Sequence, residues 1–316
     1  MRPALALFCL LLAACSQIAD PQTPPQTTKR IALSFDDAPR GDSVLYSGTD
    51  RTRAMIEALA AANIPPTVFF VTTRGMDQPE GRARIERYAG AGHLIANHTH
   101  THPWLRRTEA ETYIADLDQA EARLDGITNR RPWFRYPFLD EGRPLERRNE
   151  VYAALQSRGL INGYVTVDNY DWYIDRKWRN AIENNRDVDL AALRKAYVDL
   201  LVGAVEFYDG VAVDALGRSP AHMLLLHEND AAVYFIGDLV AALRAKGWTI
   251  VHPDEVYQDP IAQIEPLTQR TGQGRVAALA IDAGLDPATL SHLAIDENMI
   301  DAFLDERGVF GPASKD

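Results

Sequence analysis

The feature that most constrains the fold is a regular alternation of short apolar segments with longer amphipathic ones across residues 30–251. The short segments are rich in branched and aromatic residues, which predicts strands, and the longer ones show helical periodicity. Strands that alternate with helices indicate an α/β fold with a mainly parallel sheet. The predicted strands cover residues 30–35, 66–72, 93–97, 132–137, 164–168, 222–227 and 248–251. The predicted helices cover residues 51–62, 81–88, 108–124, 149–158, 176–208 and 234–245.

Polar residues at helix starts support several of these boundaries. Thr49 and Asp50 are expected to cap the helix over residues 51–62. Thr108 with Glu111 three residues later matches a capping box for the next long helix. The segment 228–230, Glu-Asn-Asp, is expected to cap the helix that follows it or to shape a pocket.

A second regularity is that chemically reactive side chains fall at the ends of predicted strands. In a parallel (β/α) barrel the carboxyl ends of the strands meet at one mouth, where active sites are built. Side chains that gather there are hard to explain by structural roles alone. The residues are Asp36, Asp37, His98, His102, Arg135, Asp168, Asp171 and His227.

The histidine pentad over residues 98–102 indicates a metal site. Neutral imidazole is the commonest side-chain ligand for transition metals. His98 and His102 are four residues apart, so on one helical turn both rings would point to the same side. A catalytic site of this kind adds a third protein ligand and leaves one position for water. By itself the pattern also suits surface or capping histidines.

The best candidate for the third ligand is the acidic pair Asp36 and Asp37. Neighbouring residues in a strand point to opposite faces, so both carboxylates serve one site only if the strand has ended and the chain turns. Pro39 agrees with such a turn. The alternative is an ordinary solvated turn.

The N-terminal segment predicts export. Residues 1–15 have a positive start and an apolar run of leader length, and they end in Leu-Ala-Ala-Cys, which resembles a lipoprotein lipobox at Cys15. The alternative is an ordinary cleaved leader. Residues 16–29 are polar and proline-rich, which predicts a flexible linker. By resemblance to Gram-negative lipoproteins, Ser16 favours an outer-membrane anchor, with the folded part in the periplasm.

Charge and cysteine content narrow the classes of function. The net charge of −11 disfavours nucleic acid and anionic membrane surfaces as partners, since phosphate binding needs a basic face. Any membrane attachment is therefore expected through Cys15 only, and no protein partner is evident. Both cysteines, Cys9 and Cys15, lie in the leader, which excludes thiol chemistry in the rest of the chain. No Gly-x-Ser-x-Gly motif is present, which disfavours a serine esterase.

Five motifs stand in the order found in the polysaccharide deacetylase family, the NodB-homology domain of carbohydrate esterase family 4, which the chain resembles over about residues 30–256. The family has T-F-D-D-G-P, H-[ST]-x-x-H, R-x-P-[YF], D-x-x-D-W and L-x-L-H. Here they read Ser34-Phe-Asp-Asp-Ala-Pro39, His98-Thr-His-Thr-His102, Arg135-Tyr-Pro-Phe138, Asp168-Asn-Tyr-Asp-Trp172 and Leu225-Leu-His227.

The resemblance implies a distorted (β/α) barrel of the NodB-homology type over residues 30–258. It leaves residues 173–220 as a helical insert and residues 259–316 as a helical C-terminal extension, both expected to add to the barrel. The insert is expected to border the groove that holds the substrate.

The resemblance also implies a role for each motif residue. Asp37, His98 and His102 would bind a divalent metal ion, with zinc favoured. Asp36 would act as general base, held by Arg135, and His227 as general acid, oriented by Asp171 or Asp168. The residues expected to contact substrate are Trp172, Leu225, Tyr136 and Phe138.

Two departures from the family pattern carry structural consequences. Ala38 replaces a glycine, so the backbone there must keep a negative φ or accept strain. Phe138 stands where tyrosine is common, so a hydroxyl is lost at that position although the backbone N–H remains.

The function implied is metal-dependent hydrolysis of N-acetyl groups on an acetylated amino-sugar polymer or oligosaccharide, of the chitooligosaccharide or peptidoglycan type. Two alternatives stay open. One is an O-acetyl esterase or small-molecule amidase on the same scaffold, and the other is a non-catalytic carbohydrate-binding lipoprotein.

Overall fold

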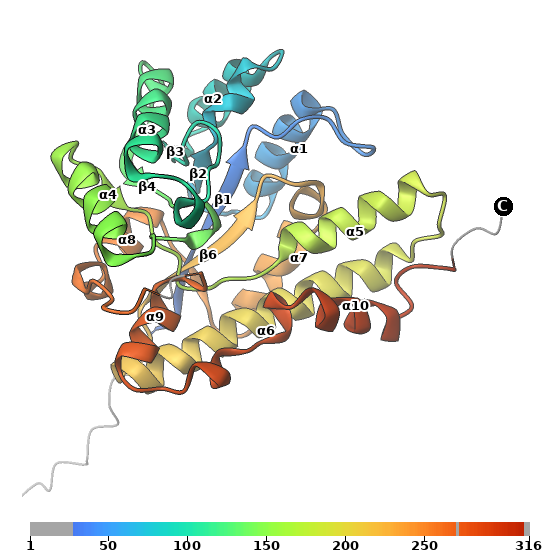
Figure 1. Cartoon of the computed structure of the whole chain (residues 1–316). Coiled ribbons are helices and arrows are strands. Elements are labelled where there is room, and N and C mark those ends of the chain that lie inside the picture. Colours follow the sequence, from blue (N-terminus) through green and yellow to red (C-terminus); the bar gives the residue numbers. More distant parts are fainter. Residues whose placement is uncertain (1–27, 270–271, 313–316) are drawn as a thin grey trace, which may run out of the picture.

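The computed structural model describes residues 28–269 and 272–312, and within them a parallel sheet of seven strands forms the core of the fold. The strand order is β5-β4-β3-β2-β1-β6, with β7 also paired to β1. The strands are β1 (Arg30–Ala38), β2 (Val68–Val71), β3 (Leu94–Asn97), β4 (Arg130–Phe134), β5 (Ile161–Asn162), β6 (Ala221–His227) and β7 (Thr249–Ile250). The sheet curls into part of a barrel, which confirms the predicted fold class (Figure 1).

Ten α-helices in the described part of the chain surround the sheet (Figure 1). Aromatic residues fill the space between strands and helices: Phe69 of β2 stacks on Phe35 and on Tyr88, with ring centroids 5.1 and 3.9 Å away. The helices are α1 (Gly48–Ala61), α2 (Gly81–Gly90), α3 (Ala110–Leu124), α4 (Leu145–Ser157), α5 (Asp171–Glu183), α6 (Leu190–Leu216), α7 (Asp230–Ala245), α8 (Pro253–Tyr257), α9 (Gly274–Asp282) and α10 (Glu297–Glu306).

Two predicted helix caps are wrong and one is confirmed. Ser47, not Thr49–Asp50, caps α1, because its side chain accepts a hydrogen bond from the Asp50 N–H. The capping box at Thr108 does not form: the Thr108 hydroxyl donates to the carbonyl of Trp104, and α3 starts without a side-chain cap. Asn229 caps α7 as expected, since its side chain accepts from the N–H of Ala232.

The predicted strand over residues 164–168 does not form. Only Val167 makes an isolated bridge, to Leu224 of β6. The Arg135 side chain explains the interruption, because its Nε donates to the carbonyl of Gly163 at 2.7 Å, a carbonyl that a continued strand would use in the sheet. The segment therefore runs beside β6 as an irregular stretch.

The helical insert and the C-terminal extension pack against each other. Helices α5 and α6 both contact α7, and α6 also contacts α9 and α10. Figure 1 shows α10 running beside the long α6. Gly274, at the start of α9, has φ +82° and lies so close to the carbonyl of Val165 that a Cβ there would come within 2.5 Å of it. The extension thus touches the irregular segment that follows β5.

No helix in the part of the chain that the structure describes is both long and apolar enough to span a membrane. The predicted leader, its lipobox at Cys15 and nearly all of the predicted linker lie outside the described residues.

Candidate active site

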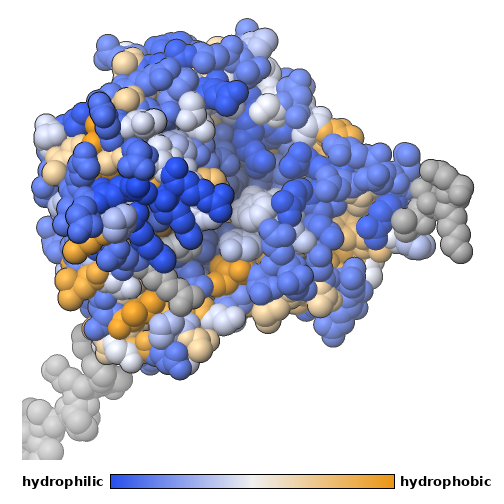
Figure 2. All heavy atoms as spheres, in the orientation of Figure 1, coloured by the Kyte–Doolittle hydropathy of each residue, from blue (hydrophilic) through white to orange (hydrophobic). Residues whose placement is uncertain are grey.

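The carboxyl ends of the central strands open onto a cavity of about 570 Å³. Figure 2 shows it as a hollow near the middle of this face, with hydrophilic residues on its walls. The parallel register of β1 and β6 pairs Asp36 directly with His227, so these two side chains reach the cavity from adjacent strands. The lining residues are Asp36, Asp37, Arg40, His98, His102, Trp104, Arg106, Phe138, Leu139, Asp168, Asn169, Tyr170, Trp172, Leu225, His227 and Gly272.

Asp36 and Asp37 both line the cavity, although the strand does not end before them as predicted. β1 continues to Ala38, but its pairing with β2 is irregular between Phe35 and Ala38. Asp37 has a left-handed backbone, with φ 67°, which breaks the alternation of side chains along the strand. Ala38 has no positive φ, so the residue that replaces the family glycine is free of that strain.

The two histidines converge through a loop, not through the helical turn that their spacing suggested. Thr99 and His102 both have positive φ, 69° and 60°. The Asn97 side chain accepts from the Thr99 N–H at 2.6 Å, and Asp116 accepts from the N–H groups of the next two residues. These bonds hold the loop so that the rings of His98 and His102 lie 4.9 Å apart between centroids.

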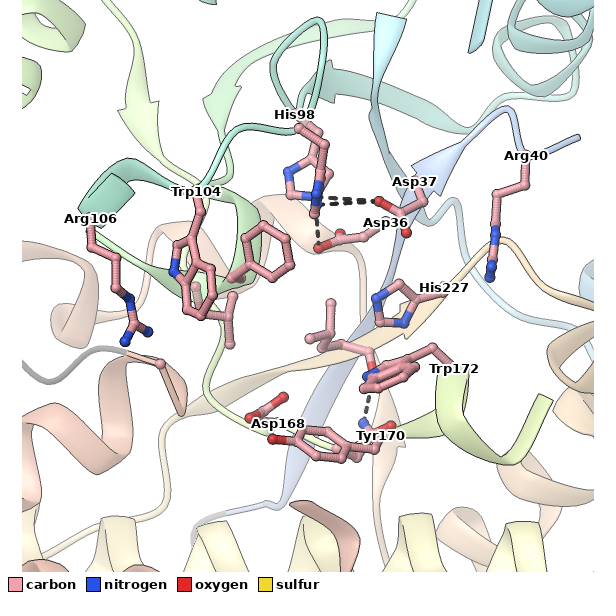
Figure 3. A pocket seen from close by; sticks show the side chains of 16 residues that line it. Asp36, Asp37, Arg40, His98, Trp104, Arg106, Asp168, Tyr170, Trp172 and His227 are labelled. Carbon is pink, nitrogen blue, oxygen red and sulfur yellow. Dashed lines mark hydrogen bonds and ion pairs between the residues drawn. The ribbon is translucent and has the colours of Figure 1, made fainter. Parts of the chain in front are cut away.

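Asp37, His98 and His102 form a compact set of potential metal ligands. One ligand atom from each lies within 4.8 Å of the other two. The Asp37 carboxylate is 3.5 Å from Nε2 of His102. It is 3.8 Å from Nε2 of His98 (Figure 3). Nδ1 of His98 lies 2.8 Å from the carbonyl of Arg135, a bond that fixes its proton there and leaves Nε2 as a lone-pair donor.

The electrostatics of this set suit a divalent cation. Burial lowers the pKa of His98 and of His102 to about 4, so both rings are neutral at physiological pH. For Asp37, burial raises the pKa but the histidines lower it further, to about 2, which keeps the carboxylate charged. Two neutral imidazoles and one carboxylate are a donor set that fits zinc.

Asp36 is held by a buried arginine. Its carboxylate accepts a hydrogen bond from Arg135 at 2.8 Å, and the same nitrogen also donates to the Ser34 hydroxyl. The guanidinium lies over the ring of Phe70, 3.8 Å from its centroid. Burial raises the pKa of Asp36 to about 6, an effect that the charge of Arg135 opposes.

His227 is paired with Asp171, the first residue of α5. The distance from His227 Nδ1 to Asp171 Oδ1 is 2.6 Å, and the other carboxylate oxygen accepts from the His227 backbone N–H and the Asn229 side chain. Burial lowers the pKa of His227, but the charge and hydrogen bond of Asp171 raise it further, to about 9. Of the two aspartates predicted as partners of His227, Asp171 is the one that contacts its ring.

Three of the four residues expected to contact substrate line the cavity. They are Trp172, Leu225 and Phe138. Phe138 has φ 58° and is half exposed, and its ring packs between His102 and Trp104. Tyr136 does not line the cavity; it is buried in an apolar cluster with Tyr113 and Phe134, because the chain stays extended past β4 and turns Tyr136 the same way as Phe134.

Several lining residues were not predicted from the sequence. Trp104 directly follows the pentad and its proline, a position that would have drawn attention to it. The Arg106 guanidinium stacks on Trp104 at 4.0 Å, and Tyr170 lies inside the fourth motif. Asn169 lies inside the same motif, and Arg40 and Leu139 directly follow the first and third motifs. Nothing local in the sequence marks Gly272, which the fold alone brings to the cavity.

A half-barrel of parallel strands, with a His–Asp pair, a carboxylate and a potential metal site at one mouth, defines a hydrolase of the distorted (β/α)-barrel class. The sequence model of the polysaccharide deacetylase family matches residues 23–156. The match covers less than half of the chain, and it shows that the N-terminal half is similar to this family of deacetylases.

The chain is also similar to deacetylases with curated functions. The chitooligosaccharide deacetylase of Rhizobium leguminosarum bv. trifolii is 26% identical over 224 residues, covering 70% of this chain and 89% of that protein. The peptidoglycan-N-acetylglucosamine deacetylase of Bacillus cereus is 28% identical over 149 residues, covering 47% of this chain and 48% of that protein. A solved CE4 family pseudoenzyme mutant with restored activity shares the fold, with a TM-score of 0.51, 18% identity, and coverage of 73% of this chain and 68% of that one.

Proposed function

We propose that the chain is a metal-dependent hydrolase that removes N-acetyl groups from amino-sugar oligosaccharides or polymers. The observation that carries this proposal is the arrangement around the cavity: a carboxylate held by arginine and a protonated His–Asp pair flank a donor set suited to a divalent ion. Zinc is the ion that the donor set favours.

The chemistry follows from the charges of these groups. Asp36, ionised above its pKa of about 6, would accept a proton from the attacking water. His227, protonated below its pKa of about 9, would donate a proton to the amide nitrogen as the C–N bond breaks. Water and amide are thereby converted to acetate and a free amine. When bound at Asp37, His98 and His102, a divalent cation would supply Lewis-acid polarisation of the acetyl carbonyl and the water.

The walls of the cavity support a sugar as substrate. Trp104, Phe138, Tyr170 and Trp172 present aromatic surface, while acidic, basic and amide side chains provide hydrogen-bonding groups. Aromatic surface combined with placed polar groups is typical of small-molecule sites. The curated relatives named chitooligosaccharide deacetylase make N-acetylglucosamine oligosaccharides the first substrate to test.

The proposed location is the periplasmic face of the outer membrane, with a lipid anchor at Cys15. The apolar run that ends in Leu-Ala-Ala-Cys supports this location, as does the proline-rich stretch that separates it from β1. An anchored deacetylase at that place would meet extracytoplasmic carbohydrate.

Acetate release from purified protein tests the proposed activity. Chitooligosaccharides, peptidoglycan and acetylated xylan should be compared in parallel, with and without a chelator. Chelator-sensitive release from the N-acetylated substrates supports the proposal. Release from acetylated xylan alone indicates an O-acetyl esterase, and binding without any release indicates a carbohydrate-binding protein.

A further inference from the structure

Asp168 is a buried carboxylate that the chemistry above does not use. It is 5% exposed and lines the same cavity. Figure 3 shows it on the Tyr170 side, well separated from His98 and the ligand set. Asp168 is therefore too far from the metal-binding residues to join them, yet it faces the space that a substrate would fill.

The hydrogen-bonding capacity of this carboxylate is largely unused. A carboxylate has two oxygens and accepts about four hydrogen bonds. Among the described residues, one donor contacts it, the backbone N–H of Asn169. Its neighbour Asp171, in contrast, receives donors from His227 and Asn229. Because Asp168 lines the cavity, its remaining acceptor sites are open to donors supplied by a ligand.

The backbone that carries Asp168 is fixed on one side by β6. The N–H groups of Thr166 and Val167 donate to the carbonyl of Met223. The Asn169 side chain donates to the carbonyl of Leu225 at 2.6 Å. The residues immediately before and after Asp168 are thus tied to the strand that ends in His227.

The C-terminal extension fixes the other side of the same segment. The Arg275 N–H, at the start of α9, donates to the carbonyl of Val165 at 2.7 Å. The Tyr170 N–H donates to the carbonyl of Ala294 at 2.7 Å. Two points of the extension, far apart in its sequence, therefore hold the stretch from Val165 to Tyr170 on either side of Asp168.

We propose that Asp168 is a substrate-binding carboxylate that accepts hydrogen bonds from hydroxyl groups of the sugar, and that the C-terminal extension holds it in place for this purpose. The inference rests on the proposed function, because it names how the sugar is recognised at that site. A sugar ring supplies several O–H donors at once, which matches the several free acceptors of one fixed carboxylate. The role is in recognition and not in proton transfer.

The first experiment compares wild type with Asp168→Ala on two kinds of substrate. The first is an N-acetylglucosamine trisaccharide, together with versions in which one hydroxyl at a time is replaced by hydrogen. The second is 4-nitroacetanilide, which carries the acetamide but no sugar hydroxyl. For the trisaccharide, Asp168→Ala should raise KM about 10- to 100-fold, as expected for the loss of several hydrogen bonds to one carboxyl group. On 4-nitroacetanilide the loss in kcat/KM should be much smaller than on the trisaccharide.

The deoxy trisaccharides identify the partner of Asp168. In wild type at least one of them should show a KM about tenfold or more above that of the parent. Asp168→Ala should bind parent and deoxy sugar equally. The inference is overturned if Asp168→Ala loses kcat/KM equally on the trisaccharide and on 4-nitroacetanilide. It is also overturned if the higher KM of the deoxy sugar persists in Asp168→Ala.

A glycine pair tests the role of the extension. In Gly274→Ala the new Cβ would meet the carbonyl of Val165 at 2.5 Å and push the segment aside. Gly284→Ala is the matched control, since its φ is also positive, +95°, but nothing lies within 4 Å. Gly274→Ala should raise KM for the trisaccharide several-fold and reduce the difference in KM between the parent and the deoxy sugars. Gly284→Ala should do neither. Equal behaviour of the two variants would remove the extension from the proposal.

Calorimetric binding of the trisaccharide separates this inference from the proposed function. If wild type binds the sugar but releases no acetate, deacetylation of this substrate is wrong, while weaker binding by Asp168→Ala still supports the inference. If Asp168→Ala binds as tightly as wild type, the inference fails even when acetate is released. Absence of binding by wild type rejects both.

Discussion

Nδ1 of His227 and Oδ1 of Asp171 lie 2.6 Å apart, and the second oxygen of the same carboxylate accepts from the backbone N–H of His227. Ring and backbone of one residue are thus held by a single buried aspartate. This double contact determines both the orientation of the imidazole and its charge.

Replacing Asp171 by Asn should move the alkaline limit of activity to a lower pH. Burial alone lowers the pKa of His227, and Asp171 raises it to about 9, so without the charge the pKa should drop to its ordinary 6.5 or below. The general acid must be protonated, so activity is lost as pH rises through this pKa. The alkaline limb of kcat/KM against pH should move from near pH 9 to below pH 7. An unmoved limb would assign the acid to another group.

Asp36→Asn should retain the metal and lose most of the activity. The side chain lies 3.6 Å from Nε2 of His98 but is not in the ligand set, and its charge is neutralised by Arg135. General bases contribute about 10²–10⁴-fold, so kcat should fall by that factor. The residual activity should no longer decline as pH is lowered through about 6, the pKa of Asp36. Elemental analysis is the check; loss of the ion would make Asp36 a ligand.

The purified protein should hold about one divalent ion per chain, bound by Asp37, His98 and His102. His102→Ala should bind the ion at least tenfold more weakly and melt at a lower temperature when metal is present, because a ligand that binds only the folded state stabilises it. His100→Ala is the control, since that ring contacts the Thr73 hydroxyl at 3.0 Å and does not line the cavity. If both variants keep the ion, the ligand assignment is wrong.

Arg135→Met should destabilise the fold as well as the reaction. The substitution would leave Asp36 buried without its cation and remove the donor to the Gly163 carbonyl. Breaking a buried ion pair by removing one partner costs about 3–5 kcal/mol in free energy of unfolding. Urea unfolding monitored by circular dichroism measures this loss. A change below about 1 kcal/mol would show that water replaces the guanidinium at low cost.

Cys15→Ala should release the protein from the membrane fraction. Stable anchoring requires more than one acyl chain, which a lipoprotein cysteine carries and an ordinary cleaved leader does not supply. Fractionation of cells that express wild type or the variant distinguishes the two. An unchanged distribution would favour the ordinary leader.

The overall fold and most of the cavity were predictable because strand–helix alternation and motif order are local signals. The ends of β1, β3 and β6 each bring expected side chains to one mouth. The failures involve backbone states that residue spacing does not encode. The His98–His102 loop owes its shape to left-handed residues and to Asp116, which lies in α3.

Other errors arose from interactions between distant segments. The strand expected at 164–168 is interrupted because the side chain of Arg135 takes a backbone carbonyl there, an event invisible in the local pattern. Tyr136 was expected at the substrate because it lies within a motif, but the extended chain just beyond β4 turns it toward Tyr113. Asp168 and Asp171 stand in one motif, and only the contact of Asp171 with the His227 ring distinguishes them.

Asp36 and His227 are paired in the ladder between β1 and β6, whereas other residues of the cavity lie in loops. Protein engineering can treat these two parts separately. The spacing between these two residues is set by backbone hydrogen bonds, so a one-residue deletion in either strand would misplace one of them, whatever the loops do. The loops that carry Trp104, Phe138 and Asp168 are not part of that ladder. Libraries that vary only these loops should therefore yield folded variants with new substrate preferences, and insertions within the two strands should yield inactive ones.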